Sequence, residues 1–167
     1  MDVDEIIKFL KLKPHPGEGG YYRETYRSDE KIPAAALPPR YKADKQFGTA
    51  IYYLLTPDSF SAFHRIPTDE IFHFYLGDPV TMFHIHPDGH GETVILGNDL
   101  KASQIPQCVV LKNVWQGSYL NKGGKFALMG TTVAPAFDFQ DFELGKREIL
   151  IKEYPNFKKI IERLTLP

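Results

Sequence analysis

Three side chains near the middle of the chain combine residue types that transfer protons: His64, Glu70 and His73. An imidazole and a carboxylate can serve as base and acid, and both also bind divalent metal ions. Alternation along a strand places Glu70 on one face with Phe72 and Phe74, and His73 then lies on the opposite face. The structural alternative is an acid capped by loop amides and a histidine hydrogen-bonded in the wall. The spacing leaves both interpretations open.

A second group of histidines, His84, His86 and His90, flanks a Pro-Asp-Gly turn. His84 and His86 share one strand face, and their spacing could hold a zinc ion. No carboxylate or cysteine in the segment clearly completes a ligand set, however, and histidines on a solvated turn give the same pattern without function. We therefore expect His84 to lie at a solvent-exposed turn.

A third candidate is the aromatic and basic run over residues 20–27. Alternation divides this run into one face with Tyr22, Glu24 and Tyr26, and another with Tyr21, Arg23, Thr25 and Arg27. Guanidinium groups bind carboxylate or phosphate through paired hydrogen bonds, so the run could hold an anionic ligand. The alternative is an exposed strand whose ion pairs contribute little to stability.

The elements that must position these residues are short strands between two terminal helices. Asp2 and Glu5 form a capping-box pattern at the start of the first helix, and apolar residues repeat at helical spacing after Pro155. Between the helices lie β-like runs separated by turn residues, a spacing typical of an all-β sandwich or barrel. The expected strands cover residues 50–55, 70–76, 80–86, 92–96, 108–112, 126–133 and 148–152, and residues 28–43 are expected to form a loop over one barrel end.

Length and composition limit the possible classes of protein. The chain of 167 residues has the length of one domain, so we treat residues 1–167 as a single domain. Its 20 basic and 21 acidic residues leave a net charge of −1, which gives no attraction to nucleic acid or to anionic membranes. The only cysteine, Cys108, rules out an internal disulfide and resembles a core cysteine.

The amino terminus and the apolar runs bear on location. No apolar run approaches the roughly 20 residues of a membrane span, and the chain begins with acidic residues where a signal peptide is basic. We therefore expect a cytoplasmic globular protein.

Four motifs in order along the chain resemble a known family. The segment from Ser61 to Gly77 is similar to the first cupin motif, Gly-x5-His-x-His-x3-4-Glu-x6-Gly, and residues 111–116 stand in the register of the second, Pro-x-Gly-x2-His. Nearly the whole chain resembles the fifth cupin family, a domain of unknown function, whose signatures are residues 14–28, 64–75, 114–116 and 133–144. The resemblance implies an all-β double-stranded β-helix (a cupin jelly-roll barrel) with short N- and C-terminal helices, commonly a homodimer, and a pocket at the open end of the barrel.

The resemblance also identifies departures from the usual cupin metal site. Of its four usual ligands this sequence matches two, His64 and Glu70, while Ile66 and Gln116 stand at the other two positions. Isoleucine cannot bind a metal ion and glutamine is a weak oxygen donor. We therefore expect no tightly bound metal or other cofactor, with weak divalent binding at His64 and Glu70 left open.

The leading hypothesis is a small-molecule-binding protein whose ligand occupies the barrel pocket. His64 and Glu70 are the candidate catalytic pair, and whether the protein is an enzyme is left open. The candidate ligand-binding residues are Tyr22, Arg23, Phe72, His73, Trp115 and Gln116. The orientation of His73 is left open, because a β-bulge would reverse the alternation and turn it inward. The expected ligand is anionic or sugar-like; the other expected partner is a second copy of the chain, and neither nucleic acid nor a membrane is expected.

Two enzyme classes are the alternatives. The 20–24 stretch and His64 are loosely similar to the deoxysugar epimerases of the same superfamily, which implies a sugar-nucleotide epimerase or isomerase with His64 as base. Such an enzyme also needs an acid, usually a tyrosine, on the other sugar face, and the sequence does not identify it. The second alternative is a metal-dependent cupin enzyme, such as a dioxygenase or decarboxylase, that uses His64, Glu70 and His73.

Overall fold

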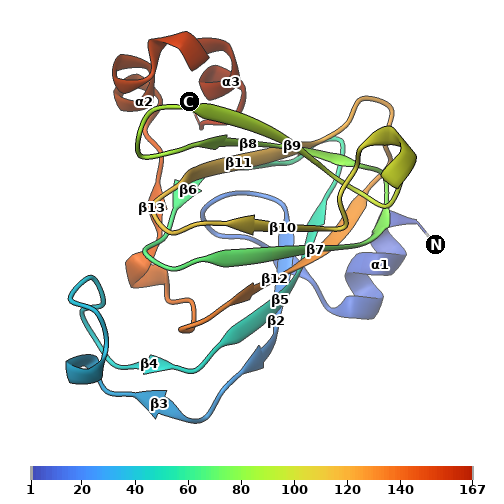
Figure 1. Ribbon diagram of the computed structural model, residues 1–167. Coiled ribbons are helices and arrows are strands. Elements are labelled where there is room, and N and C mark those ends of the chain that lie inside the picture. The colour runs from blue at the N-terminus through green and yellow to red at the C-terminus, as the bar shows by residue number, and fades with distance from the viewer. Residues whose placement is uncertain (1, 167) are drawn as a thin grey trace.

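Two antiparallel sheets face each other in a computed structural model that describes residues 2–166 (Figure 1). The six-stranded sheet has the order β1 (Lys13–Pro14), β2 (Tyr21–Arg27), β5 (Thr49–Leu55), β12 (Ala127–Val133), β7 (Glu70–Gly77) and β10 (Gln107–Val110). The five-stranded sheet has the order β13 (Glu143–Leu144), β6 (Phe60–Arg65), β11 (Trp115–Leu120), β8 (Val80–Ile85) and β9 (Gly91–Leu96). A hairpin of β3 (Lys31–Ile32) and β4 (Lys45–Gln46) stands apart from both sheets.

Short helices cover the outer faces of the sheets: α1 (Val3–Leu10), α2 (Arg147–Glu153) and α3 (Lys158–Arg163). The connecting segments contain the 3-10 turns η1 (Ala34–Ala36), η2 (Leu100–Ala102), η3 (Phe139–Asp141) and η4 (Pro155–Phe157). The predicted capping box is confirmed, because Asp2 accepts from the Glu5 amide at 2.9 Å and Glu5 accepts from the Asp2 amide at 2.8 Å. None of the helices within residues 2–166 is long and apolar enough to cross a membrane.

Three apolar clusters hold these layers together. The largest fills the space between the two sheets and includes Tyr53, Phe72 and Met82. A second lies between the outer face of the five-stranded sheet and α2 and α3, where Trp115 packs with Leu150. The third joins α1 to the outer face of the six-stranded sheet. The predicted all-β jelly roll with short terminal helices is confirmed.

The sequence prediction was wrong in some elements. Residues 148–152 form most of α2 and not a strand, because Leu150 is fully buried in the cluster under the C-terminal helices. That tertiary contact outweighs the β-like run. Strands β6 and β11 were not among the predicted strands, and His64 lies within β6. The expected loop over residues 28–43 also carries β3 and η1.

Candidate functional site

A cavity of about 330 Å³ opens between the two sheets, at the end where β6 finishes and β7 begins. Its polar lining includes His15, Glu18, His64 and Glu70. Aromatic side chains from residues 137–142 form much of the apolar wall, and basic side chains from β1 and β2 also line it. Clefts of this size that combine apolar walls with a few placed polar groups are typical small-molecule sites.

His64 is held as a neutral base. Its Nδ1 lies 2.8 Å from the Ala62 carbonyl oxygen and 3.1 Å from Oε2 of Glu18. The Ala62 carbonyl oxygen can only accept a hydrogen bond, so Nδ1 carries the ring proton and Nε2 is the acceptor. Burial lowers the pKa of His64, and the charge of Glu70 and the Ala62 hydrogen bond oppose this shift only in part. His64 therefore presents an unprotonated nitrogen at neutral pH.

Glu70 is a buried carboxyl whose protonated form is favoured. It is 8% exposed at the start of β7, and its Oε2 accepts a hydrogen bond of 2.7 Å from the Gln116 side-chain amide. Burial raises the pKa of Glu70; nearby Glu18 raises it further, while His64 lowers it. A carboxyl with a raised pKa can act as a proton donor near neutral pH.

His15 and Glu18 come from the segment between β1 and β2. Nδ1 of His15 accepts from the amides of Gly17 (3.2 Å) and Glu18 (3.1 Å), so the neutral ring carries its proton on Nε2. Burial is the main cause that lowers the pKa of His15. Burial also raises the pKa of Glu18, and nearby His15, Tyr53 and Ser61 oppose that shift only in part. The cavity is therefore lined by one imidazole that accepts through Nε2, His64, and one that donates through Nε2, His15.

A tight turn after Glu18 places that carboxyl beside His64. Gly19 has φ +100°, and a Cβ there would lie 2.4 Å from the Phe60 carbonyl oxygen. The Ala62 amide donates to the Glu18 carbonyl oxygen at 2.8 Å, which fixes the turn against β6. Only glycine adopts this backbone without strain and allows the turn to approach the strand so closely.

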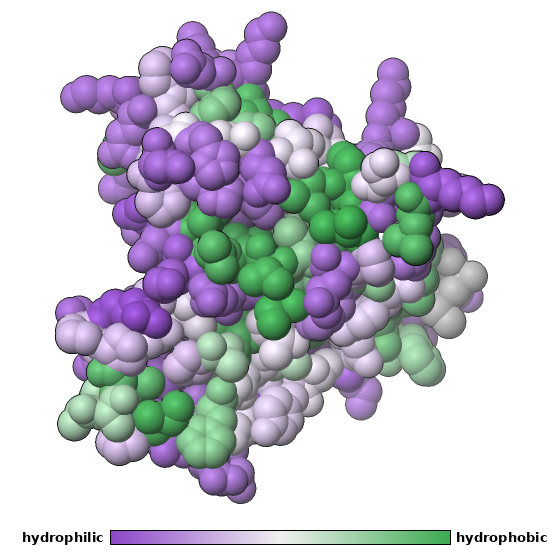
Figure 2. Space-filling view, viewed as in Figure 1, coloured by the Kyte–Doolittle hydropathy of each residue, from purple (hydrophilic) through white to green (hydrophobic). Residues whose placement is uncertain are grey.

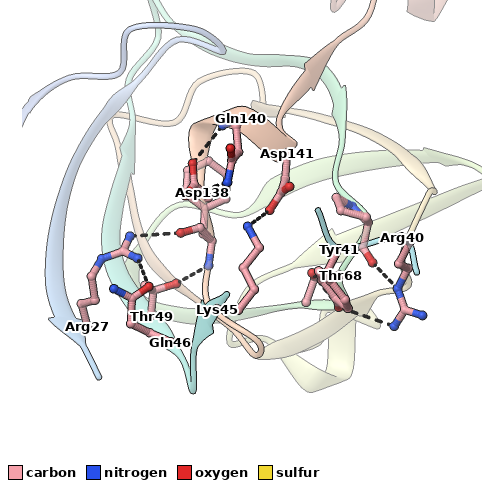
Figure 3. Close-up of polar contacts among 12 residues, drawn as sticks. Arg27, Arg40, Tyr41, Lys45, Gln46, Thr49, Thr68, Asp138, Gln140 and Asp141 are labelled. Carbon is pink, nitrogen blue, oxygen red and sulfur yellow. Dashed lines mark hydrogen bonds and ion pairs between the residues drawn. The ribbon is translucent and has the colours of Figure 1, made fainter. Parts of the chain in front are cut away.

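Polar contacts fix the aromatic wall of the cavity (Figure 3). Thr49 Oγ1 accepts from the Phe137 amide at 3.0 Å, and Arg27 donates to the Phe137 carbonyl oxygen at 3.0 Å. Lys45, which is 2% exposed, forms an ion pair with Asp141 of η3. The wall in turn positions the base, because the ring of Phe142 stacks on His64 with centroids 5.1 Å apart.

A β-bulge changes the cationic side of the cavity. The register between β2 and β5 shifts between Glu24 and Tyr26, so Arg27 joins the face that carries Glu24. Arg27 donates to both carboxylate oxygens of Glu24, at 3.0 and 2.8 Å. Lys13 and Arg23 also line the cavity, and within residues 2–166 neither forms an ion pair. The Arg23 guanidinium lies 5.5 Å from the centre of the Tyr52 ring, which packs on the outer face of the sheet. Lys13 is therefore the charge available to an anionic ligand.

The structure brings together five of the eight predicted site residues. His64, Glu70, Tyr22 and Arg23 line the cavity, and Gln116 reaches its edge through the hydrogen bond to Glu70. The other three candidate ligand-binding residues do not line the cavity: Phe72, Trp115 and His73.

Strand geometry explains these three corrections. Trp115 precedes the inward-facing Gln116, so it points to the outer face and packs under the C-terminal helices. Phe72 faces inward but fills the core beyond Glu70. His73 points to the outer face, where its ring lies 3.2 Å from Thr132 Oγ1 and 3.3 Å from the Gln107 side-chain amide. The bulge that would have turned His73 inward is absent at this position, since β7 pairs in regular register with β12 from residue 70 to residue 74.

The expectation for His84 was wrong. His84 is 2% exposed within β8, and burial lowers its pKa to about 4. The missing carboxylate is Glu92 of β9, which pairs directly with His84 across the hairpin. Cys108 is confirmed as a buried core residue, and burial raises its pKa to about 11.

Sequence reasoning missed His15, Glu18 and Phe142 as cavity residues. All three lie in segments that carried the family resemblance, residues 14–28 and 133–144. The closely spaced glycines after Glu18 were the available signal, because such turns bring backbone close to other segments.

The cavity residues do not fit the metal site that the cupin resemblance implies. Ile66 lines the cavity without a donor atom, and the Gln116 amide donates to the Glu70 oxygen that a metal ion would need. Nδ1 of His64 is directed to Ala62 and Glu18, so Nε2 is the only His64 atom that could bind an ion. Within the described residues, these side chains do not form a group of three close ligand atoms.

Comparison with known proteins agrees with this architecture. The sequence model of the DUF985 family, which belongs to the cupin superfamily, matches residues 4–145. Uncharacterized protein YML079W of Saccharomyces cerevisiae is 32% identical over 169 residues, which covers 96% of this chain and 83% of the yeast protein.

Solved structures give the same result. Protein SO0799 from Shewanella oneidensis is 40% identical with a TM-score of 0.87, covering 100% of this chain and 99% of that one. A hypothetical protein from Leishmania major is 28% identical with a TM-score of 0.89 and full coverage of both chains. Oxalate decarboxylase from Bacillus subtilis is 13% identical with a TM-score of 0.56 over 93% of this chain and 37% of that one, a likeness of fold alone. The chain belongs to the DUF985 family of the cupin superfamily.

Proposed function

We propose that the cavity binds a small polar molecule with an anionic group and transfers a proton to or from it, without a metal ion in the cavity. One observation carries the proposal: His64 and Glu70 are nearly buried, have pKa values shifted toward their neutral forms, and open onto the same cavity. Groups with pKa values shifted by burial inside a cleft are typical of acid–base sites.

The polar lining of the cavity is complementary to a ligand that both donates and accepts hydrogen bonds. His64 accepts through Nε2 and His15 donates through Nε2, since each ring has its Nδ1 engaged by backbone groups. A hydroxyl or enol group between the two imidazoles would satisfy both nitrogens. After His64 removes one proton from the ligand, Glu70 in its acid form can donate a different proton to it, since its pKa is raised. This leaves a His64 imidazolium and a Glu70 carboxylate, which exchange a proton through solvent before the next turnover.

The basic lining favours an anionic group on the same ligand. Lys13 and Arg23 have no ion-pair partner within residues 2–166, whereas Arg27 is engaged by Glu24. A carboxylate or phosphate would pair with the Lys13 ammonium, which lies 5.3 Å from the centre of the cavity-lining Tyr22 ring, whereas the Arg23 guanidinium lies over Tyr52 at the outer face. The volume of about 330 Å³ suits a metabolite of modest size, and the proposed partner is neither nucleic acid nor a membrane.

The experiment is native mass spectrometry of the purified protein, followed by a thermal-shift screen of small carboxylates and phosphates. We expect a ligand that raises the thermal midpoint of the wild type and does not raise that of Lys13→Gln or His64→Gln. A ligand that stabilises all three proteins equally, or binding only to the outer surface, would contradict the proposal.

Proton transfer on a sugar-like ligand is the second candidate function. Tyr22 lines the cavity and its ring packs edge-on against His15, with centroids 4.8 Å apart. In an isomerase, His64 would take a proton from one face of a carbon and Tyr22 would return one to the opposite face. Loss of turnover in Tyr22→Phe with retained ligand binding would distinguish this function from binding alone.

A further inference from the structure

A second group of ligating side chains lies at the end of the β8–β9 hairpin. Oε2 of Glu92 is 3.1 Å from Nε2 of His86 and 3.8 Å from Nδ1 of His84. Within residues 2–166, His84, His86 and Glu92 are the only three His, Cys, Asp or Glu residues that each offer a ligand atom within 4.8 Å of the others. We propose that these three side chains bind a divalent cation of the zinc or ferrous class, at a site separate from the cavity.

The distances suit such an ion. Zinc bonds of about 2.0–2.1 Å in tetrahedral geometry place neighbouring ligand atoms about 3.3–3.4 Å apart. The observed 3.1 and 3.8 Å lie on either side of this value, so small side-chain rotations would bring the three atoms onto one ion. Two imidazoles and one carboxylate form a donor set that both zinc and ferrous iron accept.

The backbone holds the ligands in place before any ion binds. His84 pairs directly with Glu92 in the β8–β9 register, which brings both side chains to the same sheet face. The His86 amide donates to the His90 carbonyl oxygen at 2.9 Å, closing the turn. The His90 ring also stacks on His86 with centroids 3.9 Å apart, which restricts the His86 ring.

The state of His84 is the second observation that points to a ligand. A buried histidine with a purely structural role is normally hydrogen-bonded. Nε2 of His84 has no hydrogen-bond partner, and its Nδ1 lies beyond hydrogen-bond distance from Glu92. An ion bound at Nδ1 would give this buried ring a polar contact on the Glu92 side, while Nε2 would keep none.

Solvent can reach the site from one side. The Glu92 side chain is 51% exposed and that of His86 is 19% exposed, whereas that of His84 is 3% exposed. An ion can therefore enter over Glu92, and its remaining coordination positions would face water. Gln116 pairs with His64 on one side and His84 on the other, so one residue of β11 separates this site from the cavity.

The test uses the full chain without a histidine tag, treated with a chelator and then dialysed. Titration with Zn²⁺ should show one equivalent bound, and Glu92→Gln and His86→Gln should each weaken binding tenfold or more. His73→Gln, which removes a histidine from the outer face of the other sheet, should leave the affinity within twofold of wild type. Co²⁺ should give the absorption of a protein-bound ion in the wild type and lose it in Glu92→Gln.

Separate outcomes identify failure of this inference and of the proposed function. Equal Zn²⁺ affinity in wild type and Glu92→Gln, with both variants folded by circular dichroism, would overturn the metal site. Loss of the Zn²⁺ equivalent in His64→Gln but not in His86→Gln would place the ion in the cavity and overturn both proposals.

Discussion

At the scale of single residues, the cavity gives two histidines opposite roles. The backbone decides these roles: a carbonyl oxygen accepts a hydrogen bond from Nδ1–H of His64, while two amides donate to Nδ1 of His15. Residue type alone would leave either nitrogen as the donor. Burial keeps both rings neutral, so the pattern persists at physiological pH.

Substitution of the acid–base pair should separate function from stability. We expect His64→Gln and Glu70→Gln each to lower the affinity for the ligand found in the screen tenfold or more. The thermal midpoint should stay within a few degrees of wild type. The reason is that both are buried polar groups whose burial is unfavourable in their charged forms. Calorimetric titration beside the control His73→Gln measures this, and undiminished affinity in both variants would place the site elsewhere.

Stability should depend on pH with opposite signs for the two groups. The folded protein holds His64 below the ordinary histidine pKa, so the unfolded chain takes up the proton first and the free energy of unfolding falls as pH drops below about 6.5. Glu70 has a raised pKa, so its contribution falls as pH rises above about 4.5.

Urea unfolding between pH 4.5 and 7.5 tests these signs. Relative to wild type, His64→Gln should gain stability as the solution is acidified and Glu70→Gln should gain it as the solution is made alkaline. Parallel curves for wild type and both variants would show that neither group titrates with a shifted pKa.

At the scale of elements, the segment around η3 connects the β3–β4 hairpin to the cavity. The segment supplies aromatic wall residues, and a nearly buried ion pair between Lys45 of β4 and Asp141 of η3 fixes it (Figure 3). The aromatic wall therefore depends on a polar contact between segments far apart in the sequence.

Replacing only one partner of that ion pair should lower the stability of the protein more than replacing both partners. Asp141→Asn leaves the buried Lys45 ammonium unpaired, which costs about 3 kcal/mol in the free energy of unfolding. The double variant Lys45→Met with Asp141→Asn should recover much of this loss, because no unpaired charge remains. Chemical denaturation of the three proteins measures the difference, and a double variant less stable than Asp141→Asn would refute this account.

At the scale of the whole molecule, the cupin scaffold carries a cavity from which the usual metal ligands are partly missing. Replacing Ile66 and Gln116 with histidine in a Glu92→Gln background should restore three imidazoles and one carboxylate around the cavity. We expect one added equivalent of zinc or nickel, measured by equilibrium dialysis. No gain in metal binding would mean that the strand ends hold these positions too far apart.

The surface of the molecule bears on assembly. Figure 2 shows apolar side chains gathered over the face that carries β10, where Ile105, Val109 and Leu111 are each at least 40% exposed. β10 is also the edge of the six-stranded sheet, and an exposed apolar edge strand tends to pair with another chain. We expect a homodimer by sedimentation at tens of micromolar (an order-of-magnitude concentration) and a monomer after Val109→Glu. A monomeric wild type would contradict the predicted homodimer but would leave the description of the fold unchanged.

The sequence by itself determined the class of fold and part of the site. Turn residues between short β-like runs indicated the two sheets, and the alternation of β7 correctly separated Glu70 from His73, because side-chain direction along a strand follows from local geometry. The identities of Ile66 and Gln116 likewise indicated a cavity without the usual metal ligands.

Tertiary structure alone decided which residues meet. Glu18, Phe142 and Glu92 come from three separate segments, and no local pattern states that the first two contact His64 or that the third faces His84. Trp115 and residues 148–152 were misjudged for the same reason, since their packing against each other on the outer face depends on where the C-terminal helices dock. Local patterns set the direction of a side chain, whereas pairing between distant strands sets its neighbours, and the chemistry of this protein depends on those neighbours.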